Sequence, residues 1–171
     1  MEFSNVIKSR YSVRKFKDTP VEDEKINEIL NSALLAPTAC NNQPQKIYVC
    51  RSAEVLDKLK TVCPCTFDAP VVIVMAYDKT LAAKGRIRPH YEFGETDSAI
   101  AGTHMMLTAQ NLGLGSCWVG WFRGEDVSKA LDLPENIQVT GLMPIGYPAE
   151  DAQPGELHSK SRAIEDIVEF L

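Results

Sequence analysis

Two patterns of hydrophobic residues dominate the chain, one with the spacing of a helix and one without interruption. Apolar residues recur at helical spacing from Ile26 to Leu34, after an acidic start, and Pro37 ends the predicted helix. The run from Pro70 to Tyr77 is continuously apolar and rich in β-branched residues. Such a run predicts a strand that is covered on both faces.

The stretch from Ser98 to Phe122 contains no Asp, Glu, Lys or Arg, and its length alone would permit a membrane span. However, glycines and polar residues interrupt it, and two glycines lie where a helix would have to continue. We therefore expect a buried helix that begins at Thr96 or Asp97 as its cap, ends near residue 112 and is followed by a strand over 116–121. Because this helix is apolar on nearly all sides, we expect a second subunit to cover part of it.

Shorter patterns complete the predicted order of elements in a single domain, residues 1–171. We expect helices over 2–9, 54–62 and 125–131, strands over 47–50 and 138–145, and an amphipathic turn over 163–170. The polar loop 78–94 is suited to a mobile lid, although a plain solvated excursion explains it as well. No repeat or low-complexity run divides the chain.

Composition and charge narrow the class of function. The chain has 171 residues, 44% hydrophobic and 24% charged, and a net charge of −5, which argues against a nucleic-acid-binding protein because such a protein needs a basic face. The first residues carry charges inside any apolar run, so we expect no secretion signal and a cytoplasmic location. Five cysteines without a C-x-x-C pair fit reduced thiols, and Cys63 and Cys65 lack the further ligands that a metal needs.

Two short polar segments carry the candidate chemistry. Arg10, Ser12 and Arg14 are two residues apart, so their side chains point the same way in an extended segment, while Val13 points into the protein. Two guanidiniums and a hydroxyl are suited to a phosphorylated cofactor, although an isolated pattern of this kind is also typical of a solvated basic turn. The second segment, 37–45, is a polar loop closed by prolines, which fits a ligand-facing loop or a plain connector.

Four landmarks, in this order along the chain, resemble those of the nitroreductase family. Arg10–Phe16 matches the family's R-x-S-x-R-x-F opening, and Ala36–Pro44 matches its A-P-[ST]-x-x-N-x-Q-P loop. Leu112–Gly120 is similar to its central helix-to-strand junction. Pro144–Pro148, followed by Lys160–Arg162, is similar to its last strand and C-terminal K-x-R. The resemblance covers nearly the whole chain.

The resemblance implies an α+β fold with a mostly antiparallel central sheet flanked by helices, in an intertwined homodimer with FMN sites at its interface. Arg10, Ser12 and Arg14 would hold the phosphate and ribityl chain of FMN, joined by Lys160 and Arg162 from the tail. The other positions implied for the cofactor are Tyr11, then Pro37, Thr38, Asn41 and Gln43 from the partner subunit, and Val119 and Gly120 at the flavin face.

The resemblance also implies what surrounds the reacting ring. The backbone N–H of Gly120 would reach flavin N5, because a residue without Cβ lets the main chain come close. Of Trp118 and Trp121, we expect at least one to pack in the core. Relatives often place polar or cationic side chains near the flavin's pyrimidine edge, where this chain has Cys63–Thr66. Stabilising the anionic reduced flavin would then fall to Arg14 or to backbone donors.

The function that this resemblance implies is an FMN-dependent oxidoreductase. It would take hydride from NADH or NADPH and pass electrons, in ping-pong turnover, to a nitroaromatic, a quinone or a similar small-molecule acceptor. We find no Ser-His-Asp set, no G-x-G-x-x-G and no ligand spacing among the three histidines, so we expect neither hydrolysis, zinc chemistry nor a Rossmann domain. The alternatives are a flavin-binding sensor or carrier without turnover, and another reductive reaction on this scaffold, such as dehalogenation or flavin breakdown.

Overall fold

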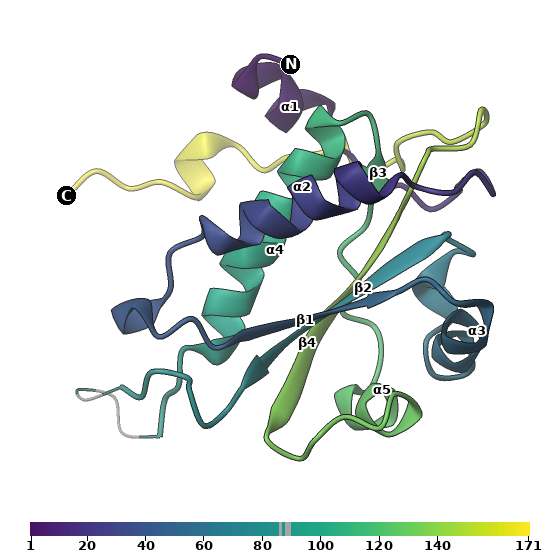
Figure 1. Cartoon of the computed structure of the whole chain (residues 1–171). Helices are drawn as coiled ribbons and strands as arrows, with labels where there is room; N and C mark the ends of the chain where they lie inside the picture. The colour runs from purple at the N-terminus through teal and green to yellow at the C-terminus, as the bar shows by residue number, and fades with distance from the viewer. Residues whose placement is uncertain (86, 88–89) are drawn as a thin grey trace.

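A four-stranded sheet forms the centre of the molecule. The computed structural model describes residues 1–85, 87 and 90–171, so part of the loop predicted as a lid, including Arg86 and Arg88, lies outside the described residues. The strands are β1 (Gln45–Cys50), β2 (Val71–Asp78), β3 (Gly115–Ser116) and β4 (Ile137–Gly146), in the order β1-β2-β4-β3 with every pair antiparallel (Figure 1). The expected α+β class with an antiparallel sheet is confirmed.

Strand β2 is buried along its whole length, as its sequence predicts. It pairs with β1 on one side and with β4 on the other, so its backbone groups are satisfied within the sheet. Its side chains alternate between two hydrophobic clusters, with Ile73 and Met75 on one face and Val72 and Val74 on the other. The continuous apolar run is therefore the consequence of a strand that has no solvent-facing side.

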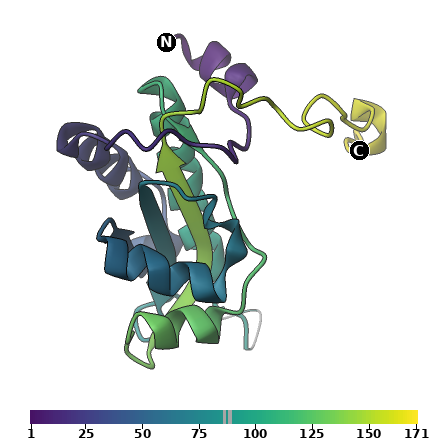
Figure 2. The same ribbon diagram turned by 90° about the vertical axis from the view of Figure 1, so that its right-hand side faces the viewer.

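Helices cover both faces of the sheet. α2 (Asp23–Leu34) and α4 (Gly94–Asn111) cover one face, and α3 (Ala53–Val62) and α5 (Gly124–Ala130) cover the other, while α1 (Phe3–Ser9) contacts α4 (Figures 1 and 2). The apolar stripe of α2 is buried at its centre, but Leu34 at its end is 69% exposed. The predicted helix is therefore present, and its last apolar residue is exposed on the single chain.

Helix α4 begins at Gly94, two or three residues before the predicted start at Thr96 or Asp97. At this start the backbone packs directly against Tyr77, because a Cβ at Gly94 would lie 2.0 Å from the Tyr77 ring. Asp97, one of the two residues predicted as the cap, instead lies within the first turn and is buried, as the cap is Phe93. Within the described residues, no helix combines the length and the apolarity that a membrane crossing requires.

The strand predicted over residues 116–121 is also shorter than expected. Only Gly115 and Ser116 form β3, and Val119 makes a single bridge to Leu142. Between them the ring of Trp118 packs against α4 and β4 at two glycines, Gly102 and Gly141, where a Cβ would lie 2.3 and 2.6 Å from it. Trp118 is therefore the core tryptophan, and Trp121 is 79% exposed.

The segment that follows α1 pairs with β3 and with the segment that follows β4, and beyond these bridges the two ends of the chain separate. Ser12 forms a parallel bridge with Ser116, and Phe16 forms an antiparallel bridge with Pro148. From residue 153 onward every residue is exposed, and the tail leaves the body of the molecule (Figure 2). Three short 3-10 turns complete the structure: η1 (Ala39–Asn41), η2 (Pro64–Thr66) and η3 (Ile164–Asp166) in the tail.

Candidate functional site

The side chains of Arg10, Ser12 and Arg14 line one hollow of about 590 Å³, together with residues 155–158 at the start of the tail. The backbone explains why they share a side. The N–H of Val13 donates to Ser116 O at 3.0 Å, and the Val13 side chain is 1% exposed. The prediction that alternate residues converge while Val13 points inward is confirmed.

Among the described residues, no carboxylate neutralises the two arginines of this hollow. Over residues 1–85, 87 and 90–171, no carboxylate forms an ion pair with Arg10 or Arg14, although Glu156 also lines the hollow. The neighbouring lysines differ, because Lys15 pairs with Asp151 and Lys17 lies 3.5 Å from a carboxylate oxygen. Two unpaired guanidiniums beside a hydroxyl provide donors that suit a dianionic phosphate.

A buried thiol lies next to this hollow. Burial raises the pKa of Cys117, while Arg14, Ser12 and Arg10 act to lower it. Because burial raises a pKa that already lies above neutral pH for an ordinary thiol, the group that interacts with the arginines is a neutral thiol at neutral pH. It therefore leaves the positive charge of the hollow uncompensated.

The two tail residues that were also predicted to bind the phosphate do not reach this hollow. Lys160 and Arg162 lie on the exposed tail and do not line the hollow, and Arg162 Nη2 donates to Asp166 O at 2.7 Å. Tyr11 has a different role from the arginines. Its hydroxyl donates to Ala152 O at 3.4 Å and its ring meets that of His158 edge to face, which holds the start of the tail against the Arg10–Arg14 segment.

The loop over residues 37–43 lies on the opposite side of the chain from Arg10–Arg14 (Figure 1). The Thr38 hydroxyl accepts the Gln43 N–H at 3.1 Å, which closes the loop on itself. Asn41 and Gln43 have positive φ angles of 54° and 50° and are exposed. Within one chain the structure does not bring these predicted residues to the phosphate hollow.

Gly120 lies beside an open surface. Val119, which precedes it, is 5% exposed and belongs to the core, whereas a Cβ at Gly120 would meet no atom within 4 Å. Its φ is not in the left-handed region either. Neither packing nor backbone conformation within the chain requires glycine here, so the space in front of it is available to a ligand.

The cysteine-containing turn borders the same segment. The Cys63 thiol lies 4.0 Å from Trp121 O, and burial raises the pKa of Cys63. Cys65 follows in η2 and is half-buried. In the part of the chain that the structure describes, no cluster of three or more metal-ligating side chains is present.

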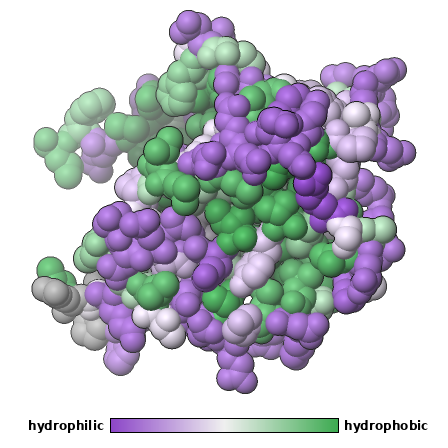
Figure 3. Space-filling view, in the orientation of Figure 1, coloured by the Kyte–Doolittle hydropathy of each residue, from purple (hydrophilic) through white to green (hydrophobic). Residues whose placement is uncertain are grey.

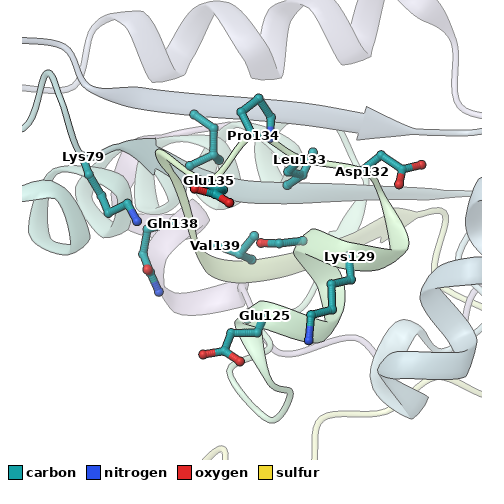
Figure 4. A pocket seen from close by; sticks show the side chains of 12 residues that line it. Lys79, Glu125, Lys129, Asp132, Leu133, Pro134, Glu135, Gln138 and Val139 are labelled. Atoms are coloured by element: carbon teal, nitrogen blue, oxygen red, sulfur yellow. The ribbon is translucent and has the colours of Figure 1, made fainter.

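A second hollow, of about 550 Å³, lies between α5, the turn that follows it and the beginning of β4 (Figure 4). Its charged side chains carry both signs: Lys79 and Lys129, with Glu125, Asp132 and Glu135. None of the predicted site residues lines it. Because its carboxylates outnumber its cations, it is less suited to a phosphate than the hollow at Arg10.

Sequence reasoning did not identify the contact between Asp97 and the loop over residues 37–43. Its Oδ1 accepts the N–H of Ala39, at the start of η1, at 3.0 Å. An acid near the expected start of a helix has the pattern of an ordinary cap, so nothing in the sequence distinguished this contact.

The chain belongs to the nitroreductase family, whose model matches residues 7–65 and 60–147. A protein of Methanothermobacter thermautotrophicus, provisionally named NADH dehydrogenase/NAD(P)H nitroreductase, is 32% identical over 95% of this chain and 85% of its own length. A nitroreductase family protein of Clostridium difficile 630 has a similar structure, with a TM-score of 0.92, 33% identity and coverage of 99% and 98% of the two chains. An FMN-dependent nitroreductase of C. difficile R20291 matches with a TM-score of 0.75 and 28% identity, over 93% of this chain and 98% of that one.

Proposed function

We propose that this protein is an FMN-dependent NAD(P)H oxidoreductase of the nitroreductase type, whose electron acceptor is a nitroaromatic, a quinone or a similar small molecule. The observation that carries the proposal is the hollow lined by Arg10, Ser12 and Arg14, whose arginines have no carboxylate partner among the described residues. Family membership and the names of relatives support the same conclusion, since they include an FMN-dependent nitroreductase and an NAD(P)H nitroreductase.

The residues present fit FMN at both of its ends. Arg10 and Arg14 would bind the phosphate through charge-assisted hydrogen bonds, and the Ser12 hydroxyl can donate a further bond. At the other end, the open surface at Gly120 would admit the edge of a planar ring close to the backbone N–H. Val119 supports this surface from beneath, since it is fixed in the core and pairs with Leu142.

Bound FMN would accept hydride from the nicotinamide and deliver electrons to the second substrate at the same place. The chain's own contribution is binding and orientation. The arginines would hold the phosphate, and the backbone at Gly120 would offer the ring edge a fixed donor that requires no reorganisation during the reaction. Where a cation would stand near the ring, the chain has the free cysteines Cys63 and Cys65.

We also propose that the active form is a homodimer. The Pro37, Thr38, Asn41 and Gln43 loop lies far from the phosphate hollow of its own chain, so it can contribute to a flavin site only across a subunit interface (Figure 1). Apolar side chains are exposed on α1, around the end of α2 and on the tail (Figure 3). They include Phe3, Leu34, Leu35, Ile164, Ile167 and Phe170.

A second copy would cover this surface and would bring Lys160 and Arg162 of the tail close to the FMN phosphate. The groove between α1, α2 and α4 is lined by Phe3, Leu35 and Leu107 and has a volume of about 470 Å³. The exposed tail carries apolar side chains that match it in character. We propose that docking the tail on a partner orders Lys160 and Arg162 near the phosphate. A cytoplasmic location is part of the proposal and is supported by five free thiols.

The test is FMN affinity and reduction. The wild-type protein should bind FMN, and anaerobic NADH or NADPH should bleach its absorption; a protein that binds no FMN, or bound FMN that neither nicotinamide reduces, would contradict the proposal. Arg10→Ala should weaken binding by about 10- to 150-fold, because a hydrogen bond to a charged group is worth about 1.5–3 kcal/mol. Arg51→Ala is the matched control, since Arg51 pairs with Asp23 and does not line the hollow.

A further inference from the structure

Asp97 is a carboxylate buried inside the fold, and its hydrogen bonding is incomplete. The residue is 2% exposed in the first turn of α4. Its Oδ1 accepts the Ala39 N–H at 3.0 Å, and its Oδ2 is buried without a hydrogen-bond partner in the described structure. No cation among the described residues pairs with it. Burying a carboxylate without full hydrogen bonding costs free energy. Its presence here is explained if a neighbouring N–H donor requires an acceptor at this position.

The loop that Asp97 contacts is held in an unusual conformation. Cys40, Asn41 and Gln43 all have positive φ angles, of 56°, 54° and 50°. L-residues disfavour this region, and such residues persist only where surrounding contacts enforce them. Inside the loop, the N–H groups of Asn41 and Asn42 donate to Thr38 O and Ala39 O. These local bonds close the turn but do not attach it to the body.

Among the described residues, two side-chain hydrogen bonds attach the loop to the rest of the chain. Asn42 Nδ2 donates to Leu81 O at 3.0 Å, on an exposed turn. The other contact is Ala39 to Asp97, which is partly buried and joins residues 58 positions apart. The Thr38 side chain, which precedes η1, does not cap it, because its hydroxyl accepts the Gln43 N–H instead. Asp97 therefore supplies from α4 the cap that the turn lacks.

We propose that Asp97 is a positioning residue, which fixes the loop over residues 37–43 by accepting the Ala39 N–H. The inference rests on the proposed function, in which this loop meets the FMN of the partner subunit. It is the acceptor oxygen and not the negative charge of Asp97 that does this, because no cation is paired with it. The loop would otherwise open, and the side chains at 38, 41 and 43 would lose their fixed orientation toward the flavin.

The first experiment compares Asp97→Ala, Asp97→Asn and Ser98→Ala. Asparagine retains an acceptor oxygen and removes the charge, whereas alanine removes both. Ser98 is the matched control, since it is the adjacent buried residue and its hydroxyl contacts Thr140 at 2.7 Å instead of the loop. FMN dissociation constants and hydrogen exchange of the apoprotein are measured for each, with the amides of residues 41–43 as reporters of the loop.

Asp97→Ala should raise the FMN dissociation constant about tenfold, as expected for one hydrogen bond, and accelerate exchange at residues 41–43 by at least as much. Asp97→Asn should restore both to within about threefold of the wild type, and Ser98→Ala should leave both unchanged. Equal damage in the Asn and Ala variants would overturn the role of the acceptor. Unchanged loop exchange in Asp97→Ala would overturn the positioning role altogether.

A second variant removes the donor without touching α4 and covers the case in which Asp97→Ala does not fold. Ala39→Pro deletes the N–H at the first position of η1, where proline is tolerated, and Thr38 before it is extended at φ −131° and ψ 154°, as a following proline requires. Faster exchange at residues 41–43 in Ala39→Pro supports the proposal, and unchanged exchange contradicts it. If the wild type binds no FMN, the proposed function fails, while the exchange measurements on the apoprotein still decide the role of Asp97.

Discussion

The contact between Gly102 of α4 and the Trp118 ring allows a quantitative test of how the 117–121 segment is held. A Cβ at Gly102 would lie 2.3 Å from Cζ3 of Trp118, and a Cβ at Gly141 would lie 2.6 Å from Cζ2 of the same ring. Favourable carbon contacts are at about 3.5–4.0 Å, so Gly102→Ala requires a shift of more than about 1 Å. Gly141 borders a neighbouring edge of this ring, so the ring has little room to move.

Two effects of opposite sign determine how Gly102→Ala changes the free energy of unfolding. Overpacking of a core costs about 1–3 kcal/mol, while replacing glycine by alanine inside a helix gains about 1 kcal/mol. We expect a net destabilisation of about 0–2 kcal/mol in the wild-type background. In the Trp118→Leu background the collision is absent, and the same substitution should stabilise the protein by about 1 kcal/mol. The coupling between the two sites is therefore about 1–3 kcal/mol.

The assay is urea unfolding followed by far-ultraviolet circular dichroism, which does not depend on the tryptophan signal. All four proteins of the double-mutant cycle are compared at one protomer concentration, because association would contribute to apparent stability. A coupling energy below about 0.5 kcal/mol would show that the two residues do not collide and would refute this packing. In the single Gly102→Ala variant FMN binding should also weaken, since displacement of Trp118 moves the backbone at Gly120.

Three further predictions address the flavin surface, the interface and the thiols. Gly120→Ala should change unfolding free energy by less than about 0.5 kcal/mol, because its Cβ meets nothing, yet weaken FMN binding; unchanged affinity in a titration would remove Gly120 from the site. Phe170→Asp should shift the protein toward monomers in sedimentation, because Phe170 is 96% exposed in the single chain, and an unaltered dimer would exclude this residue from the interface. Burial raises the pKa of Cys50 to about 11, so only about 0.1% is thiolate at pH 8, and a thiol-specific disulfide reagent should modify the exposed Cys40 first. Rapid modification of Cys50 in the folded protein, located by peptide mapping, would contradict the buried placement.

Local patterns were sufficient for most elements of the fold. The unbroken apolar run of β2, the periodic stripe of α2 and the alternation of Arg10, Ser12 and Arg14 each depend on a repeat within a few residues, and each is present as predicted. The predicted start of α4 and the predicted length of β3 were wrong. At both places a ring packs against glycines that are distant in the sequence: Tyr77 against Gly94, and Trp118 against Gly102 and Gly141. No local pattern contains that information.

The sequence by itself determined most helical and extended segments, the antiparallel α+β class and the family of the protein, because these follow from periodicity and from landmarks in a fixed order. Only the tertiary structure decided that the Arg10–Arg14 hollow and the 37–43 loop lie on opposite sides of one chain, and that Asp97 binds the loop instead of capping its own helix. Both outcomes depend on contacts between residues far apart in the chain, whose geometry is set by packing.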